Sequence, residues 1–115
     1  MNTVILTGYL GAAPEIEESN DVTYARLSLA TNERFTTKEG DRVERTDWHR
    51  IVAFGGLAKS LVWLDKGARV GVRGRLQVNT YVKDGEKRTR VEVLAAEIEF
   101  LDRRGKDEEP AGEGE

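Results

Sequence analysis

The segment Thr46–Gly55, T-D-W-H-R-I-V-A-F-G, is the most informative stretch of the chain, because it predicts one strand with two different surfaces. Side chains alternate between the two faces of a strand. One face therefore carries Trp48, Arg50, Val52 and Phe54, and the other carries His49, Ile51 and Ala53. A charged side chain is rarely buried without a partner, so Arg50 indicates that its face is exposed. Two aromatic rings with a cation between them favour single-stranded nucleic acid, whose bases stack while its phosphates meet Arg.

The charges around this segment support the same interpretation. The whole chain has a formal net charge of -3, yet residues 34–90 hold 14 Lys or Arg against 7 Asp or Glu. The field close to a ligand matters more than the net charge of the whole molecule. The sequence therefore predicts a basic middle region between acidic ends.

Alternating apolar residues predict strands on both sides of the central segment. Upstream they are Asn2–Leu10, Val22–Thr31 and an arm beginning at Phe35, with a hairpin tip at Lys38–Asp41. Alternation predicts that Val22–Thr31 buries one face and leaves the other in water. Asn2–Leu10 is apolar on both faces, which predicts that both are covered.

Downstream, Gly55-Gly56 ends the central strand, and leucines at helical spacing predict one short helix over residues 57–64 before Lys66-Gly67. Two further strands follow, Arg69–Val82 and Arg88–Leu101, joined by a hairpin tip at Lys83–Glu86. A shift of apolar parity predicts a β-bulge near Ala95-Ala96. Glycines inside the preceding strand predict sharp coiling or close backbone approach.

Composition excludes several classes of protein. The chain of 115 residues has no cysteine, which excludes disulfides, thiolate chemistry and zinc-finger sites. No apolar run approaches the length of a membrane span, and the N-terminus lacks the order of a signal peptide. These features predict a soluble, intracellular protein.

The order of three strands, a helix and two strands predicts an all-β fold, a five-stranded Greek-key barrel of the OB type. Residues 1–101 are expected to form this single domain. Residues 102–115 carry Gly and Glu but no Ile, Leu or Phe, and are expected to be a disordered acidic tail.

Four stretches of the chain carry a resemblance to a known family. They are N-T-V-I-L-T-G-Y-L-G at Asn2–Gly11, L-A-T-N-E at Leu29–Glu33, T-D-W-H-R-I-V-A-F-G at Thr46–Gly55 and K-G-A-R-V at Lys66–Val70. Over residues 1–101 the chain closely resembles the bacterial single-stranded DNA-binding protein family. The resemblance implies an OB-fold that coats single strands without sequence preference, as a homotetramer or a dimer, with no catalysis, metal or cofactor.

The resemblance also implies which residues bind DNA. Base stacking falls on four aromatic side chains: Phe35, Trp48, Phe54 and Tyr81. Two of them, Phe35 and Tyr81, stand where well-known members carry Trp, which predicts stacking with less ring area. Lys66 matches a basic position of the family, although Lys-Gly is also an ordinary helix stop. Several other positions that are often basic in the family are neutral here, and Arg73 and Arg75 are expected to compensate.

A partner subunit is expected to cover part of the barrel. Because Asn2–Leu10 is apolar on both faces, Val4 and Leu6 are predicted at the subunit interface. His49 joins them through the resemblance. A catalytic role for His49 with Asp47 is disfavoured, because no nucleophile and no second histidine accompany them.

Two other functions remain open at this point. The chain could be an OB-fold adaptor of the primosomal kind that works through protein contacts, or a small nuclease or phosphatase. The four stacking positions favour a DNA binder over an adaptor, and the lack of a carboxylate or histidine cluster disfavours an enzyme. The family usually recruits replication and repair proteins through an acidic tip with an apolar anchor. The final Glu113-Gly114-Glu115 has no such anchor, so recruitment through it is doubtful.

Overall fold

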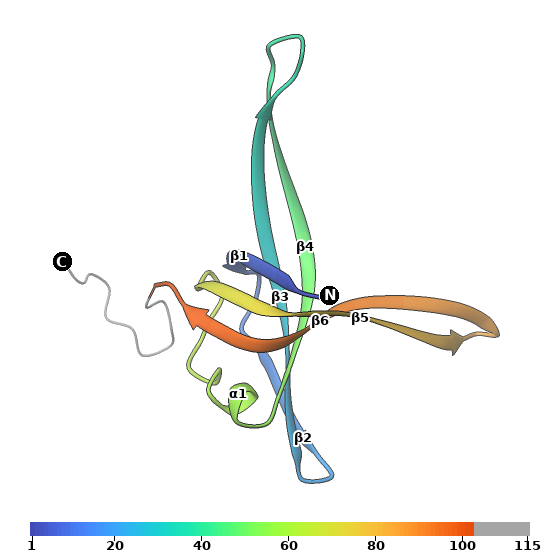
Figure 1. Ribbon diagram of the computed structural model, residues 1–115. Coiled ribbons are helices and arrows are strands. Elements are labelled where there is room, and N and C mark those ends of the chain that lie inside the picture. The colour runs from blue at the N-terminus through green and yellow to red at the C-terminus, as the bar shows by residue number, and fades with distance from the viewer. Residues whose placement is uncertain (103–115) are drawn as a thin grey trace.

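A β-barrel and two projecting hairpins account for the part of the chain that this computed structural model describes, residues 1–102 (Figure 1). The elements are β1 (Val4–Leu10), β2 (Glu15–Ser19), β3 (Val22–Thr36), β4 (Arg42–Phe54), α1 (Gly55–Lys59), β5 (Arg69–Lys83) and β6 (Glu86–Phe100). The strands follow the order β1-β5-β6-β4-β3-β2, and β1 also pairs with β3. This extra pairing closes a barrel of five strands, β1, β3, β4, β5 and β6.

The barrel has the predicted OB-type connections. Its neighbouring strands are antiparallel except β4 and β6, which run parallel with Ile51 opposite Val93. Closure occurs where Tyr9 pairs with Ala30. The prediction of a five-stranded all-β barrel with one short helix is therefore confirmed.

β2 is an additional strand that the sequence analysis did not predict. It pairs with the first half of β3 from Glu15 opposite Arg26 to Ser19 opposite Val22. Ile16 is its only apolar residue, so it lacks the apolar alternation of a strand. The turn before β3 could have been recognised from Asn20 and Asp21, residue types that suit tight hairpin turns. Both have the positive φ that such a turn requires, at 53° and 64°.

The core fills the inside of the barrel with side chains from every barrel strand and from the segment after β4. The alternation predicted for β3 and β4 is confirmed, since Leu29, Ile51 and Ala53 are completely buried. The remaining buried core residues are Leu10, Ala25, Leu27, Ala58, Leu61, Leu64, Ala68, Val70, Val72, Val93, Ala95 and Ile98.

The helix is shorter than predicted. α1 ends at Lys59, and residues 60–63 form turns, because the amides of Leu61 and Leu64 bond carbonyls three residues back. The Ser60 hydroxyl also bonds the Leu57 carbonyl at 2.6 Å, and such local bonds compete with a continuing helix. Leu61 and Leu64 are nevertheless completely buried, so the apolar pattern located the core correctly while overextending the helix.

Two long hairpins leave the barrel in different directions, as Figure 1 shows for β3–β4 and β5–β6. Both predicted tips are confirmed. The first tip is closed by a hydrogen bond of 2.8 Å from the Thr37 amide to the Asp41 carbonyl. The second closes through Asp84 and Gly85, which both have positive φ. The strands are therefore longer than the barrel itself requires.

The predicted bulge lies where β5 meets β6. Arg73 pairs with Glu97 and Gly74 pairs with Ala95, so Ala96 is the extra residue. A Cβ atom on Gly74 would overlap the backbone carbonyl of Leu94. The close backbone approach predicted from the glycines is thus found at Gly74.

The two faces of β1 have different surroundings. Val4 and Leu6 point inward and are partly buried against the core, and their place at a subunit interface stays a prediction. The outward side chains are Ile5, which is 72% exposed, and Tyr9, which is 45% exposed. Alternation assigned the two sets correctly: the barrel uses the even-numbered side chains of β1 for its own core and leaves Ile5 and Tyr9 exposed.

The described chain continues just past β6. The Leu101 amide bonds the Arg69 carbonyl at 2.9 Å, and the Arg69 amide donates to the Asp102 carboxylate at 3.3 Å. The acidic tail predicted over residues 102–115 lies outside the described residues from position 103 onward. Within residues 1–102, no helix is long and apolar enough to span a membrane.

Candidate nucleic-acid interface

The outward face of β4 presents the predicted rings and cation to solvent. Trp48 is 60% exposed, Phe54 is 49% exposed, and Arg50 between them is exposed. Val52, on the same face, is buried. On the inward face Ile51 and Ala53 are core residues and His49 is half-buried, so the predicted separation of the two faces is confirmed.

The ring of Trp48 lies against the backbone at Gly11, directly after β1. A Cβ atom on Gly11 would stand 2.5 Å from the Cζ3 atom of the indole. The Gly11 amide bonds the Ser28 carbonyl of β3 at 2.9 Å, which fixes this loop. The absence of a side chain at Gly11 therefore allows the indole to rest on the loop while more than half of it remains exposed.

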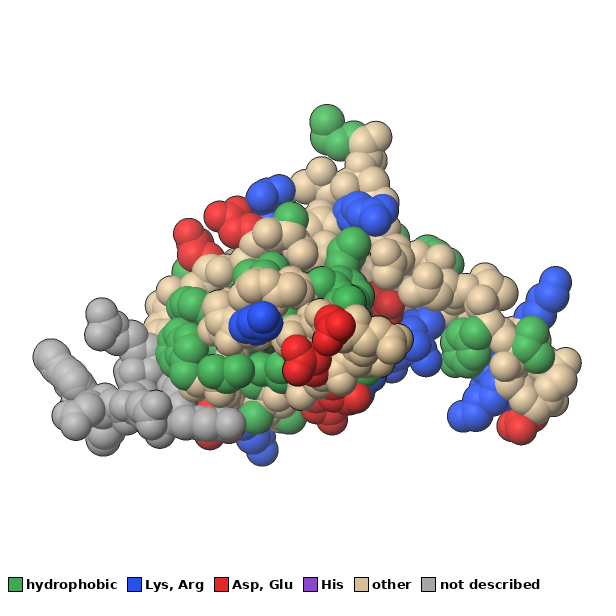
Figure 2. Space-filling model, turned by 90° about the horizontal axis from the view of Figure 1, so that it is seen from below, with side chains coloured by type: hydrophobic (Ala, Val, Ile, Leu, Met, Phe, Trp, Pro, Cys, Tyr) green, Lys and Arg blue, Asp and Glu red, His purple; other side chains and the backbone are tan. Residues whose placement is uncertain are grey.

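A groove beside Trp48 collects residues from β3, β4 and β6. It is lined by Arg26, Ser28, Trp48, Arg50, Arg90 and Glu92, among others. Glu92 is buried, and its carboxylate accepts a hydrogen bond from Asn79 at 3.1 Å. Figure 2 shows Lys and Arg side chains gathered where the β5–β6 hairpin leaves the barrel. A groove with an indole wall and three arginines matches the bases and phosphates of a single strand.

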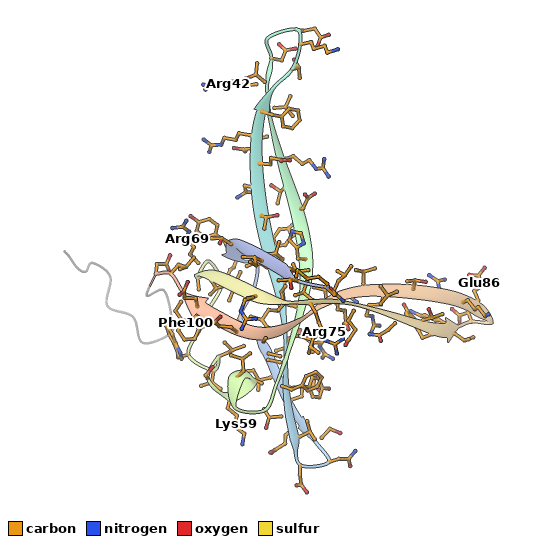
Figure 3. All side chains as sticks on the ribbon, in the orientation of Figure 1. Arg42, Lys59, Arg69, Arg75, Glu86 and Phe100 are labelled. Carbon is orange, nitrogen blue, oxygen red and sulfur yellow. The ribbon has the colours of Figure 1, made fainter. Side chains whose placement is uncertain are left out.

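The β5–β6 hairpin adds one ring and two cations. The guanidinium of Arg90 lies 5.0 Å from the centre of the Tyr81 ring, within the range of a cation–π contact. Since Arg90 also lines the groove, it links Tyr81 to the face of Trp48. Arg75 lies at the base of the hairpin, and Glu86 marks its far end (Figure 3). Within residues 1–102, Arg50, Arg75 and Arg90 form no ion pair with a carboxylate.

Arg73 differs from Arg75 although both were predicted to bind phosphate. Its Nε atom donates to the Glu97 carboxylate at 3.0 Å, and both side chains are about half exposed. Arg73 also pairs in register with Ile5 and lines a shallow hollow with it. Arg75 is therefore the freer of the two predicted cations.

A second aromatic cluster borders Phe54 on the same outward face. Tyr24 of β3 stands directly opposite Phe54, with ring centres 6.3 Å apart and planes tilted by 42°. The guanidinium of Arg26 lies 5.5 Å from the centre of the Tyr24 ring. The exposed rings of β4 thus continue onto β3.

Two carboxylates of β2 hold Arg26 in place. Arg26 bonds Glu17 at 2.5 Å and Glu15 at 3.4 Å, and the Tyr24 hydroxyl donates to Glu17 at 3.0 Å. The negative charge of Glu17 raises the pKa of Arg26 above its already high usual value, so Arg26 stays cationic. The cluster therefore contains a permanent cation that is partly neutralised by its neighbours.

The remaining predicted site residues lie apart from this face. Phe35 is 46% exposed on the β3–β4 hairpin opposite Val43. The register of β3 and β4 places Phe35 on one face of the hairpin and Trp48, which pairs with Ala30, on the other face. Lys66 lies in the turn before β5, where its amide bonds the Asp65 carboxylate, and it is outside the groove.

His49 is on the inward face of β4, near the end of the barrel core. Its Nε2 atom lies 2.8 Å from the Thr31 hydroxyl, whereas Asp47 accepts a hydrogen bond from Arg45 at 3.2 Å. His49 and Asp47 thus have different partners. Among residues 1–102, no group of three His, Cys, Asp or Glu side chains could hold a metal ion.

Sequence reasoning missed Tyr24, Arg26 and Arg90 as candidate binding residues, although each left a signal. Tyr24 and Arg26 stand on the face of their strand that alternation left in water. Arg90 could have been located by pairing residues outward from the hairpin tip. Tyr81 then stands opposite Arg88, and Arg90 lies two residues further along β6. Such diagonal neighbours across two strands are within reach of long side chains.

Comparison with known proteins agrees with the geometry. The profile of the single-strand binding protein family matches residues 1–101. Single-stranded DNA-binding protein 1 of Chlorobaculum tepidum is 38% identical over 105 residues, which cover 88% of this chain and 65% of that protein. The single-stranded DNA-binding protein of Neisseria meningitidis serogroup A is 39% identical over 104 residues, covering 88% of this chain and 60% of that protein. The chain thus spans less than two thirds of the length of these two relatives, 65% and 60%.

Two solved structures have the same fold. The Plasmodium falciparum SSB in complex with ssDNA gives a TM-score of 0.81 at 31% identity, covering 89% of this chain and 96% of that chain. A deletion mutant of the single-stranded DNA binding protein from Thermus aquaticus also gives 0.81, at 34% identity, over 90% of this chain and 52% of that chain.

Proposed function

Because this chain belongs to the single-strand binding protein family, we propose that it binds single-stranded DNA without sequence preference. It would coat and protect exposed strands during replication, recombination and repair, in the cytoplasm beside the nucleoid. The observation that carries this proposal is the outward face of β4. There two exposed rings, Trp48 and Phe54, flank Arg50, and the groove beside them contains Arg90.

Binding of this kind needs no chemical step. Bases stack on the exposed faces of Trp48, Phe54 and Tyr81, and every base has such a face, so the sequence matters little. Backbone phosphates meet Arg50, Arg75 and Arg90. Phe35 would serve a strand that follows the other face of the β3–β4 hairpin.

Titration with poly(dT) tests the proposal directly. Trp63 packs against the core and meets Phe100 edge-on at 4.8 Å, so it contributes background fluorescence. In a Trp63→Phe variant, Trp48 is the only tryptophan, and stacking of bases on its exposed ring should quench most of the emission. Unchanged emission at saturating poly(dT) would contradict the proposal and favour an adaptor that works through protein contacts.

We also propose that the protein forms a homo-oligomer, a tetramer or a dimer, through the outward face of β1. Ile5 is 72% exposed there, and Tyr9 follows it on the same face. Neighbouring exposed apolar side chains on one face of a strand form the kind of surface that a second subunit can cover. His49, expected at the interface through the family resemblance, remains part of this proposal.

We expect Ile5→Lys to lower the oligomeric state, because burying an unpaired charge opposes association. His49→Lys should act in the same direction. Sedimentation at micromolar concentration measures the effect. Val62→Lys, at another exposed apolar position, is the matched control and should leave the oligomer intact. A wild-type monomer at that concentration would refute the proposal.

A further inference from the structure

The cluster of Tyr24 and Arg26 lies on the same outward surface as the proposed DNA-binding face. Strand register places Tyr24 opposite Phe54 and Arg26 opposite Val52, in the same outward row as Trp48. Arg26 also lines the groove that contains Trp48, Arg50 and Arg90. A strand that stacks on Phe54 therefore comes next to Arg26.

The surroundings of Arg26 prepare it to bind an anion. The Tyr24 ring supports the guanidinium on one side, and two oxygen atoms from separate carboxylates bind its nitrogen atoms. Carboxylate and phosphate oxygens fit a guanidinium in the same way. The geometry that holds Glu15 and Glu17 is thus also suitable for a phosphate group.

The ion pairs of Arg26 are exposed and can be exchanged. The side chain of Arg26 is 45% exposed, and those of Glu15 and Glu17 are 71% and 51% exposed. Exposed pairs of this kind contribute little free energy, since water screens them. A strand already anchored on neighbouring rings supplies its phosphate at high local concentration, which favours the exchange.

We propose that Arg26 is a further phosphate-binding residue of the single-strand path, where a backbone phosphate replaces the carboxylates of Glu15 and Glu17. Tyr24 acts as a positioning residue that supports the guanidinium beside Phe54. This inference rests on the proposed function. It extends the path from Trp48 and Phe54 onto β3, toward the β2–β3 hairpin. The two β2 carboxylates then set the affinity of this position by competing with DNA.

The first test measures how poly(dT) affinity depends on salt. Each phosphate contact on a single strand contributes about 0.7 to the slope of log affinity against log salt concentration. Arg26→Gln should therefore lower the steepness of that slope by about 0.7. An unchanged slope in Arg26→Gln, with quenching of Trp48 intact, overturns the Arg26 position and leaves the proposed function standing. Absence of quenching in the parent protein instead overturns both.

The second test asks whether the carboxylate acts through Arg26. Glu17→Gln should tighten binding about two- to fivefold, the range expected for an exposed ion pair. Glu18→Gln is the matched control, because it makes the same charge change at the next residue, which has no ion pair with Arg26. Equal effects of the two changes would reveal a general charge effect and contradict the proposal.

A double-variant cycle completes the test. In the Arg26→Gln background, the gain from Glu17→Gln should disappear, since the competition requires the guanidinium. A gain of the same size in both backgrounds would overturn the proposal. Tyr24→Phe keeps the ring and removes the bond to Glu17, so it should retain the salt slope of the parent. Thermal unfolding of each variant checks that the β2–β3 hairpin, which these residues also connect, remains folded.

Discussion

Replacement of Trp48 by alanine is expected to weaken binding to poly(dT) about 5- to 150-fold. The exposed indole offers the largest stacking surface on the outward face of β4, and one stacked base contributes roughly 1 to 3 kcal/mol. The fold should remain intact, because the ring is 60% exposed and is not part of the buried core. Fluorescence anisotropy of a labelled dT oligonucleotide measures the affinity, and circular dichroism checks the fold.

The controls separate stacking from the general effect of a lost side chain. Trp48→Phe keeps a smaller ring and should retain most of the affinity. Phe54→Ala should also weaken binding, by less, since its ring is smaller and partly covered by Tyr24. Trp63→Phe changes a ring packed on the core and should leave affinity unaffected. Wild-type affinity in a folded Trp48→Ala variant would show that the site has been assigned wrongly.

The second large effect concerns stability. Gly74→Ala is expected to destabilise the barrel by about 1 to 3 kcal/mol or more, because the added methyl group overlaps the Leu94 carbonyl. A backbone carbonyl within a strand pair cannot rotate aside as a side chain can. The β5–β6 pairing must then separate at the bulge, next to Arg75 and the base of the hairpin. Urea or thermal unfolding measures the loss.

Gly71→Ala is the matched control for that change. Gly71 lies in the same strand, but the nearest atom to an added Cβ would be a Leu101 methyl group at 3.7 Å, an ordinary contact distance. The free energy of unfolding of Gly71→Ala should stay within about 0.5 kcal/mol of that of the parent, because the added methyl group meets no close contact. Equal losses at the two positions would mean that glycine flexibility, rather than close approach, matters in β5.

Most of the barrel could be predicted from the sequence because its signals are local. Alternation in β4 separated Ile51 and Ala53 from Trp48 and Phe54, since every second side chain shares a face. Hairpin tips followed from turn residues, and the bulge at Ala96 from a parity shift. β2 was missed because its pairing with β3 depends on a neighbour rather than on its own apolar residues. The helix was overextended because apolar spacing does not distinguish a helix from buried turns.

The candidate site was predictable only in part, for a related reason. A strand pattern tells which residues share a face, but it does not tell which face of a neighbouring strand lies beside it. Phe35 has the expected residue type, yet its register puts it on the opposite side of the ribbon from Trp48. Arg73 has the same charge as Arg75, yet only Arg73 meets a carboxylate of β6.

Three features follow from the sequence alone: the all-β class, the order of the strands along the chain, and the outward face of Trp48, Arg50 and Phe54. Each depends on residues close together in the chain. Which cations are free to meet a phosphate follows only from the folded arrangement, because it depends on side chains of neighbouring strands, such as Glu97 of β6 for Arg73 and Glu17 of β2 for Arg26. The fold also brings Arg90 into the groove beside Trp48, because closure of the barrel places β6 beside β4.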